Sequence, residues 1–272
     1  MKKMFLVLSL LLALGLSACS ATSYEVVEGN TLVVGLEAAY APYNWTTQTQ
    51  NDFTEPLSGQ PGAFADGFDV VVARHIADEL GLVLVIKAIE WDGLIPALQA
   101  GQIDVIIAGM SPTSERAKTV NFSTEYYRAQ QVMVVRSNSA FASATTLAGF
   151  SGAKVVAQLG TLQDDLIDQI PNVVHATPLD SYNALTNSVL SGVADAFIAE
   201  LPVAMSIVQS NSNLTFINFT GTNGFTLSEE DVTTAVALRQ RDTALLQAIN
   251  GVLAQLSIET RDAWMLAALN RQ

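Results

Sequence analysis

Two series of alternating short apolar runs and amphipathic stretches follow each other along the chain, and this pattern restricts the possible folds more than any other sequence feature. The first series predicts strands at residues 31–36, 82–89 and 104–108 and helices at 68–80 and 92–101. Helices that connect strands through short loops are typical of βαβ units in a parallel sheet. The pattern therefore predicts an α/β fold.

A second series of the same kind begins near residue 132. It predicts strands at 132–135, 154–158, 173–176, 194–199 and 232–238, and helices at 162–170, at 180–192, from Pro202 onward and twice at the end of the chain. Two such series predict two α/β lobes with parallel sheets. Residues 46–62 are polar, contain several Pro and Gly residues and do not fit the alternation, so we expect a surface excursion near the first strand.

Size and charge narrow the function classes. A chain of 272 residues is beyond the usual limit of a single hydrophobic core, which allows two lobes or one large domain. The 26 acidic side chains outnumber the 13 basic ones and give a formal net charge of −13. Nucleic-acid phosphates are bound by clustered Lys and Arg, and the sequence has no basic run. We therefore expect no nucleic-acid partner.

The first residues have the features of an export signal. Lys2 and Lys3 precede an apolar stretch, Met4 to Leu16, that is too short to span a bilayer as a helix. Its end, Leu16-Ser17-Ala18-Cys19, resembles the lipobox of bacterial lipoproteins, in which the cysteine is lipidated and becomes the first mature residue. We expect a signal peptide at 1–18, a lipid anchor and spacer at 19–30, and an extracytoplasmic protein tethered to the cell membrane or to the periplasmic face of an envelope.

The residues that enzymes and metal sites require are scarce. Cys19 is the only cysteine, so the body of the protein has no disulfide, no Cys-ligated zinc and no Cys nucleophile. His75 and His175 lie a hundred positions apart, and no Gly-x-Ser-x-Gly, Walker or Gly-x-Gly-x-x-Gly motif occurs. The sequence predicts no catalytic residues, no metal and no cofactor.

Eight segments together resemble the solute-binding proteins of polar amino-acid ABC importers, the family of the lysine/arginine/ornithine-, histidine- and glutamine-binding proteins. In order, they are Glu37–Tyr43, Gly67–Asp69, Trp91–Leu98, Gly101–Asp104, Gly109–Arg116, Phe122-Ser123, Leu159–Thr161 and Asp195–Glu200. The resemblance covers essentially the whole mature chain. It implies a two-lobed type II periplasmic-binding-protein fold with two hinge crossovers and a ligand cleft between the lobes.

By the same resemblance, the crossovers fall near 129–131 and 230–233. Lobe 1 is then formed by 31–130 plus 231–272, and lobe 2 by 131–230. The family implies binding of a free amino acid, cleft closure around it and delivery to a membrane permease, with a monomer as the expected state.

The charges of an amino acid explain part of the motif set. Because a buried unpaired charge is costly, the carboxylate needs a cation and the ammonium an anion. Arg116 can grip the carboxylate with its planar fork. The resemblance places Gly109, Met110 and Ser111 beside Arg116 in the first lobe, and Thr161 at a helix N-terminus in the second. Glu200 follows a buried run and matches the family's acidic partner of the ammonium, where many members have Asp.

The remaining predicted site residues concern the ligand side chain. The resemblance puts Tyr40 and Trp91 on either side of it, although both could also belong to the core. Glu37 matches a family acid that reaches a basic side chain, so we predict a cationic ligand, arginine ahead of lysine. Gln158 could hydrogen-bond a cationic or a neutral side chain, and glutamine or another polar amino acid is the alternative. Asp52 and Asp66 could add negative charge, but a solvated loop position is expected for each.

Two other roles are possible on this fold. Cyclohexadienyl dehydratase is an enzyme with the same architecture, and Glu37 or Glu200 could in principle act as a general acid. A sensor that passes the closed state to a membrane kinase is the other. The set of residues suited to a zwitterion favours a binding protein over the enzyme.

Overall fold

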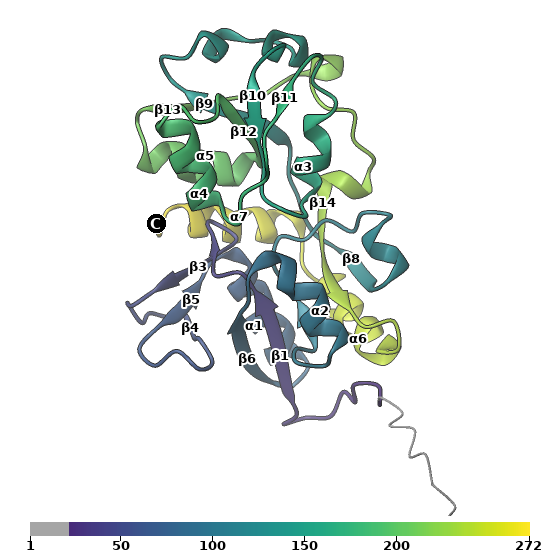
Figure 1. Cartoon of the computed structure of the whole chain (residues 1–272). Helices are drawn as coiled ribbons and strands as arrows, with labels where there is room; N and C mark the ends of the chain where they lie inside the picture. The colour runs from purple at the N-terminus through teal and green to yellow at the C-terminus, as the bar shows by residue number, and fades with distance from the viewer. Residues whose placement is uncertain (1–21) are drawn as a thin grey trace, which may run out of the picture.

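The computed structural model describes residues 22–272, so the predicted signal peptide and Cys19 lie outside the described residues. Figure 1 shows two lobes, one above the other, each built on a five-stranded sheet. None of the helices within residues 22–272 combines the length and the hydropathy needed to cross a membrane.

The lower lobe in Figure 1 contains the first sheet. Its strands, in spatial order, are β6 (Val83–Ala88), β1 (Thr31–Leu36), β7 (Val105–Ile106), β14 (Thr233–Leu238) and β8 (Asn121–Arg128). Its helices are α1 (Phe68–Glu79), α2 (Leu94–Gln99), α6 (Thr243–Leu253) and α7 (Ile258–Leu269). The alternation of side chains along β14 sends Val236 and Leu238 to the apolar cluster that includes α1, α6 and α7, and Ala237 to the cluster that includes α2. Helices therefore cover both faces of this sheet.

The upper lobe contains the second sheet. Its strands, in spatial order, are β11 (Val174–His175), β10 (Lys154–Val156), β12 (Ala196–Glu200), β9 (Gln131–Arg136) and β13 (Leu214–Ile217). Its helices are α3 (Leu162–Ile167), α4 (Tyr182–Leu190) and α5 (Leu201–Ser210). In β12, Phe197 and Ala199 face the cluster that includes α4 and α5, whereas Ala196 and Ile198 face the cluster that includes α3. The predicted two-lobed α/β fold is confirmed.

The prediction of purely parallel sheets is wrong. Strands β1, β6 and β7 are parallel, as are β10, β11 and β12, but β14 runs antiparallel to β7 and β8, and β9 runs antiparallel to β12 and β13. The chain enters β9 and β14 directly from the other lobe. Neither strand is therefore preceded by the crossover helix that connects two parallel strands of one sheet. Strands β8 and β13 were not predicted, because their mixed polar and apolar residues give no clean apolar run.

The excursion at 46–62 is part of a small third sheet rather than an irregular loop. Strands β2 (Ala39–Tyr40), β3 (Asn44–Thr47), β5 (Phe64–Asp66) and β4 (Glu55–Pro56) pair antiparallel in that order. Leu57, at its end, is buried and bridges to Ile86 in β6. The excursion is thus attached to the first lobe.

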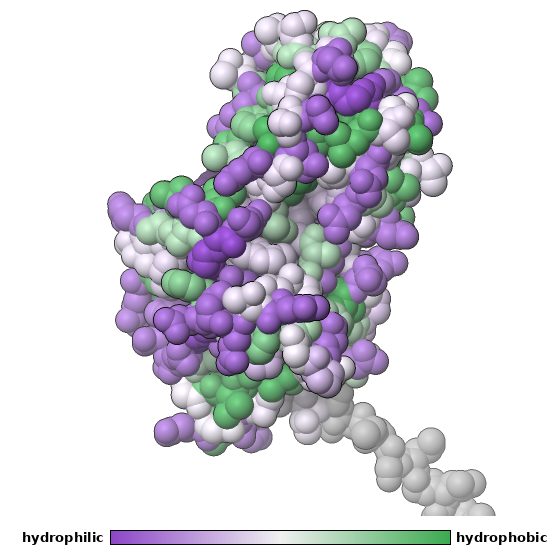
Figure 2. Space-filling model, turned by 90° about the vertical axis from the view of Figure 1, so that its left-hand side faces the viewer, coloured by the Kyte–Doolittle hydropathy of each residue, from purple (hydrophilic) through white to green (hydrophobic). Residues whose placement is uncertain are grey.

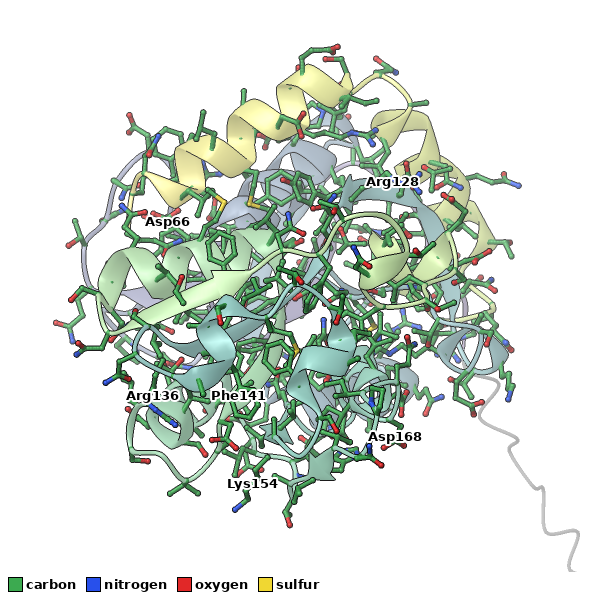
Figure 3. The ribbon with its side chains drawn as sticks, turned by 90° about the horizontal axis from the view of Figure 1, so that it is seen from above. Asp66, Arg128, Arg136, Phe141, Lys154 and Asp168 are labelled. Atoms are coloured by element: carbon green, nitrogen blue, oxygen red, sulfur yellow. The ribbon has the colours of Figure 1, made fainter. Side chains whose placement is uncertain are left out.

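The two passages of the chain between the sheets run side by side. One follows β8 and the other precedes β14, and the Ala129 amide donates a hydrogen bond of 2.9 Å to the Val232 carbonyl. Helix α7 is a further link, since it contacts α5 of the upper lobe, as the view from above shows (Figure 3). The side view in Figure 2 shows the narrowing between the lobes.

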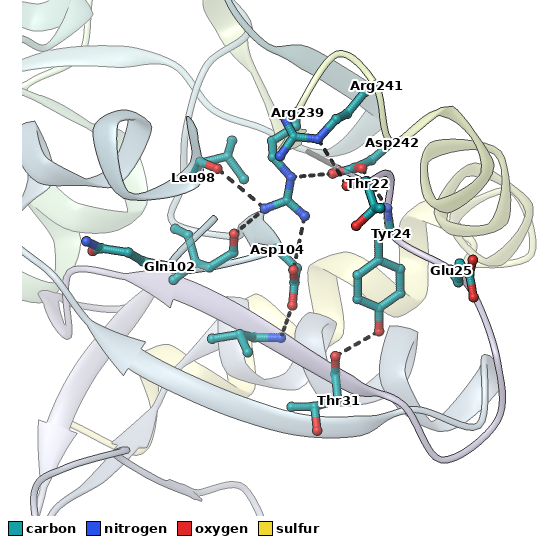
Figure 4. Close-up of polar contacts among 12 residues, drawn as sticks. Thr22, Tyr24, Glu25, Thr31, Leu98, Gln102, Asp104, Arg239, Arg241 and Asp242 are labelled. Atoms are coloured by element: carbon teal, nitrogen blue, oxygen red, sulfur yellow. Dashed lines mark hydrogen bonds and ion pairs between the residues drawn. The ribbon is translucent and has the colours of Figure 1, made fainter. Parts of the chain in front are cut away.

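A buried arginine, Arg239, forms ion pairs that link distant segments of the first lobe (Figure 4). Arg239 is 7% exposed and places its guanidinium 3.0 Å from Asp104 Oδ1 and 2.6 Å from Asp242 Oδ2. The other oxygen of Asp104 accepts from the Val33 amide, and that of Asp242 accepts from the Tyr24 amide. Tyr24, within the predicted spacer, therefore lies against the first lobe.

Gly67 shows why the chain needs glycine at the start of α1. Its φ is +135°, and a Cβ atom there would lie 2.2 Å from the Tyr43 carbonyl oxygen. The loop can approach this closely because the next two amides, of Phe68 and Asp69, donate to the carbonyls of Pro42 and Tyr43. The first turn of α1 thereby holds the loop that precedes β3.

We predict that Gly67→Ala lowers the free energy of unfolding by more than about 1 kcal/mol, because both the backbone conformation and the space exclude a side chain. Gly251→Ala is the matched control: it lies inside α6, and a Cβ there meets nothing within 4 Å. The control should raise stability by about 0.5–1 kcal/mol through helix propensity. Urea unfolding of the wild type and the two variants measures both changes in the free energy of unfolding. Equal effects of the two substitutions would contradict the close approach at Gly67.

Candidate ligand-binding site

The predicted site residues follow strands of both sheets. In the first lobe, Glu37 comes directly after β1 and Gly109 shortly after β7, while Trp91 opens a short 3₁₀ helix (Trp91–Gly93) beyond β6. In the second lobe, Gln158 follows β10 and Glu200 ends β12. Ligands of α/β proteins bind beyond the carboxyl ends of the strands. The predicted site residues lie at this edge of each sheet, and the two edges face each other.

A small cavity of about 10 Å³ lies where the two edges meet. Of the predicted residues, eight line it: Tyr40, Trp91, Gly109, Ser111, Arg116, Gln158, Thr161 and Glu200.

Arg116 supplies the cation on the first-lobe side. It opens a 3₁₀ helix (Arg116–Lys118), and its guanidinium donates to the Ser111 carbonyl at 2.8 Å and to the Gly160 carbonyl of the other lobe at 3.2 Å. The indole of Trp91 lies under the guanidinium, 5.1 Å from its centre, and donates to the same Gly160 carbonyl at 3.1 Å. Burial lowers the pKa of Arg116 to about 10, so the side chain stays a cation at neutral pH.

Glu200 supplies the anion on the second-lobe side. It is 5% exposed; one oxygen accepts from Gln163 Nε2 at 2.8 Å and the other accepts from the Tyr40 hydroxyl of the first lobe. Burial raises the pKa of Glu200, while the bonds from Tyr40 and Gln163 oppose that rise. Tyr40 stacks on Tyr43, with ring centroids 5.2 Å apart, so it belongs to the core and to the cavity wall at once.

Glu37 is a second buried carboxylate, directly behind the cavity-lining residue Gln158. It is 7% exposed, and its Oε1 accepts from Gln158 Nε2 across the cleft at 2.9 Å. Its Oε2 has no hydrogen-bond partner within residues 22–272. Burial raises the pKa of Glu37 to about 7; the bond from Gln158 opposes the rise, and the nearby charge of Glu90 adds to it. A cation would find an unused acceptor here.

The mouth of the cleft is acidic. A larger hollow of about 580 Å³ adjoins the cavity at Trp91, which lines both. Its charged lining residues are Glu90, Asp92 and Asp180, and no Lys or Arg is among them. Clefts lined by one sign of charge raise the local concentration of the opposite ion, so this mouth favours the approach of a cation.

Two predicted residues lie outside the cavity lining. The Met110 side chain is buried among the apolar residues that pack on α2, and its carbonyl accepts from Ala235, while Glu37 reaches the cavity through Gln158. Asp66, labelled in Figure 3, is not a solvated loop acid as expected, because it is buried and pairs with Arg271 at 2.6 Å. Asp52 is exposed, as expected.

Three cavity-lining residues were missed from the sequence: Leu162, Gln163 and Tyr182. Thr161 caps α3 by accepting from the Asp164 amide at 3.3 Å, so the first turn of this helix faces the cavity. Leu162 and Gln163 could have been found from that cap. Tyr182 starts α4 after Ser181, but nothing in the sequence indicates that this helix points its first residue toward the other lobe.

Two lobes with a charged cavity between them define a binding protein that encloses a small polar molecule. The chain matches the model of the bacterial extracellular solute-binding proteins, family 3, over residues 32–263, and it belongs to that family. It is 28% identical to the arginine-binding extracellular protein ArtP of Bacillus subtilis, over 94% of this chain and 93% of that protein.

Two further similarities bear on the ligand. The chain is 30% identical to the ABC transporter glutamine-binding protein GlnH of Bacillus subtilis, over 76% of this chain and 71% of that protein. An amino acid ABC transporter substrate-binding protein of Streptococcus pneumoniae bound to L-arginine has a TM-score of 0.75 and 26% identity, covering 89% of this chain and 94% of that one. These relatives are binding proteins rather than enzymes, which favours binding without catalysis over the dehydratase alternative.

We predict that Arg116→Met lowers the affinity for L-arginine at least about tenfold, because the carboxylate loses its charge-assisted hydrogen bonds. Lys118→Met is the matched control: the same charge is removed from the same 3₁₀ helix, but this side chain is exposed and pairs with Glu115. Its affinity should stay within about twofold of wild type. Calorimetric titration compares the three proteins, and an equal loss in both variants would remove Arg116 from the site.

Proposed function

We propose that this protein captures a cationic amino acid, arginine ahead of lysine, and delivers it to the permease of an ABC importer. The observation that carries the proposal is Glu37, a buried carboxylate bonded to the cavity-lining Gln158, with one oxygen unpartnered within the described residues. An ion of this kind is costly to bury, and a guanidinium or ammonium of the ligand would compensate it. The acidic mouth formed by Glu90, Asp92 and Asp180 supports the same choice.

Binding is coupled to closure because the ligand's partners are divided between the lobes. We assign lobe 1 to 31–130 plus 231–272 and lobe 2 to 131–230. The ligand carboxylate binds Arg116 in lobe 1, and the ammonium binds Glu200 in lobe 2. Both contacts form only when the lobes approach, so the ligand shifts the equilibrium toward the closed form, which a permease can read. The protein acts as a monomer.

Glutamine is the second candidate ligand. Gln158 lines the cavity and could accept or donate a hydrogen bond to a neutral amide, and one relative is named as a glutamine-binding protein. The difference between the candidates rests on the charge of Glu37, so a test of selectivity has to change that charge.

The test is the ratio of the affinities for L-arginine and L-glutamine, measured by calorimetry on protein that was unfolded and refolded to remove bound ligand. Glu37→Gln should lower this ratio at least about 30-fold, since a buried charge pair is lost. Between about pH 6 and about pH 8 the wild-type ratio should rise about tenfold, because Glu37 ionises as the pH passes its raised pKa of about 7. The variant's ratio should be constant.

Glutamine serves as an internal reference for the pH series. Both ligands carry an α-ammonium, so titration of Glu200 changes the two affinities alike and leaves their ratio unchanged. Glu90→Gln is the control variant, since it removes the same charge from an exposed position at the mouth, and its ratio should change less than about threefold. A wild-type preference for glutamine, or an unchanged ratio in Glu37→Gln, would overturn the assignment of a cationic ligand.

We also propose that a lipid at Cys19 keeps the protein at the membrane beside its permease. The wild-type chain and the control Ser20→Ala, produced in a bacterium that processes lipoproteins, should incorporate labelled palmitate, and Cys19→Ser should not. Label retained in Cys19→Ser, or absent from the wild type, would contradict the anchor.

A further inference from the structure

Asp69 is a buried acid that the site described above does not use, although it belongs to the Gly67–Asp69 motif. It is 0% exposed and is the second residue of α1. Its position in the first turn places the carboxylate near the positive end of the helix dipole. The side chains that donate hydrogen bonds to it come from two different strands, β3 and β8.

These donors form one continuous chain. Asp69 Oδ2 accepts from Asn44 Nδ2 at 2.8 Å, and Asp69 Oδ1 accepts from the Tyr126 hydroxyl at 2.7 Å. On the far side of Asn44, its Oδ1 accepts from the Ala38 amide at 2.7 Å. On the far side of Tyr126, its hydroxyl oxygen accepts from the Gly109 amide at 3.0 Å. A single carboxylate thus connects Ala38 to Gly109.

One end of this chain lines the cavity, and the other adjoins a predicted site residue. Ala38 lies between Glu37 and the strand that carries Tyr40, and Gly109 lines the cavity. Each has a left-handed backbone, with φ of +56° at Ala38 and +62° at Gly109. Such a φ is unfavourable for alanine and persists only when the surroundings hold it. The two amide hydrogen bonds provide that hold.

The direction of every hydrogen bond in the chain follows from its ends. The Ala38 amide can only donate, so Asn44 turns its oxygen to Ala38 and its NH₂ group to Asp69. The Gly109 amide also only donates, so the Tyr126 hydroxyl must pass its own hydrogen to Asp69. The central group therefore receives a donor from each side. An ionised carboxylate meets this requirement, whereas the isosteric amide of asparagine would turn a donor toward one of the two donors.

We propose that Asp69 is a positioning residue that fixes the two ligand-binding loops of the first lobe against each other. It fixes the position of segment 37–40, which contacts the ligand side chain in the proposed function, relative to segment 109–116, which contacts the ligand carboxylate. Burial raises the pKa of Asp69 to about 6, while the hydrogen bonds from Tyr126, from Asn44 and from the nearby Gly109 amide limit that rise, so the group is still ionised at neutral pH. The consequence for binding rests on the proposed function, but the link between the loops does not.

The test uses two variants that break the chain at different points and two controls. Asp69→Asn removes one acceptor and keeps the shape, and Tyr126→Phe removes the hydroxyl between Asp69 and Gly109. Tyr127→Phe is the matched control, a neighbouring tyrosine of β8 whose hydroxyl is outside the chain. Val72→Ala controls for stability, because it lies in the same helix among apolar residues and is not part of the hydrogen-bonded chain.

We expect Asp69→Asn and Tyr126→Phe each to weaken L-arginine binding at least about tenfold, and the double variant to lose little more than Asp69→Asn alone. Val72→Ala should lower the melting temperature and leave Kd within about twofold. In ¹⁵N spectra, Tyr126→Phe should shift the Ala38 amide signal, which Tyr126 does not contact, and Tyr127→Phe should not. Either an unshifted Ala38 signal or an equal loss of affinity in Val72→Ala overturns the proposal. If the wild type binds no arginine, the proposed ligand fails, while the spectra still decide the link between the loops.

Discussion

The structure depends on how the two opposite charges of an amino acid can be taken out of water. Neither charge can be buried without a partner, and the two partners that we propose lie in different lobes. Arg116 follows a strand of the lower sheet, and Glu200 ends a strand of the upper one. Both residues line the same small cavity between the lobes. In the proposed function, ligand binding is therefore coupled to closure of the two lobes.

Three buried carboxylates have different roles because their partners differ. Glu200 accepts hydrogen bonds from both lobes, through Gln163 and Tyr40, and stands opposite Arg116. Glu37 has one oxygen occupied by Gln158 and one free, which suits the cationic end of a ligand. Asp69 accepts hydrogen bonds from two strands, through Asn44 and Tyr126, and is not among the residues that line the cavity. Burial raises the pKa of all three, and the hydrogen-bond partners decide what each carboxylate can do.

The sequence predicted the strands and helices of the βα units well, because their apolar periodicity is local. Thr31–Leu36 has the predicted bounds, and α1 ends one residue before the predicted end. The orientation of β9 and β14 could not be read in this way, since it depends on passages between lobes rather than on a repeating unit. Strand β8 was missed because Asn121–Arg128 alternates weakly between polar and apolar residues.

The same distinction applies to the site. Most of the lining residues could be predicted from the motif set, as the placement of Arg116, Thr161 and Glu200 shows. The cross-lobe partners of those residues could not, because the bond from Gln158 to Glu37 joins positions 121 residues apart. The role of the Gly67–Asp69 motif also required the structure, since Asn44 and Tyr126 carry no sequence signal that pairs them with Asp69.

The central claim is that a cationic amino acid lies between the lobes with each of its charges on a named residue. A crystal structure of refolded protein with L-arginine tests this most directly. The account predicts the α-carboxylate on Arg116, the α-ammonium on Glu200 and the guanidinium within hydrogen-bond distance of Glu37. Arginine bound outside this cavity, or inside it with the guanidinium directed away from Glu37, would contradict the account.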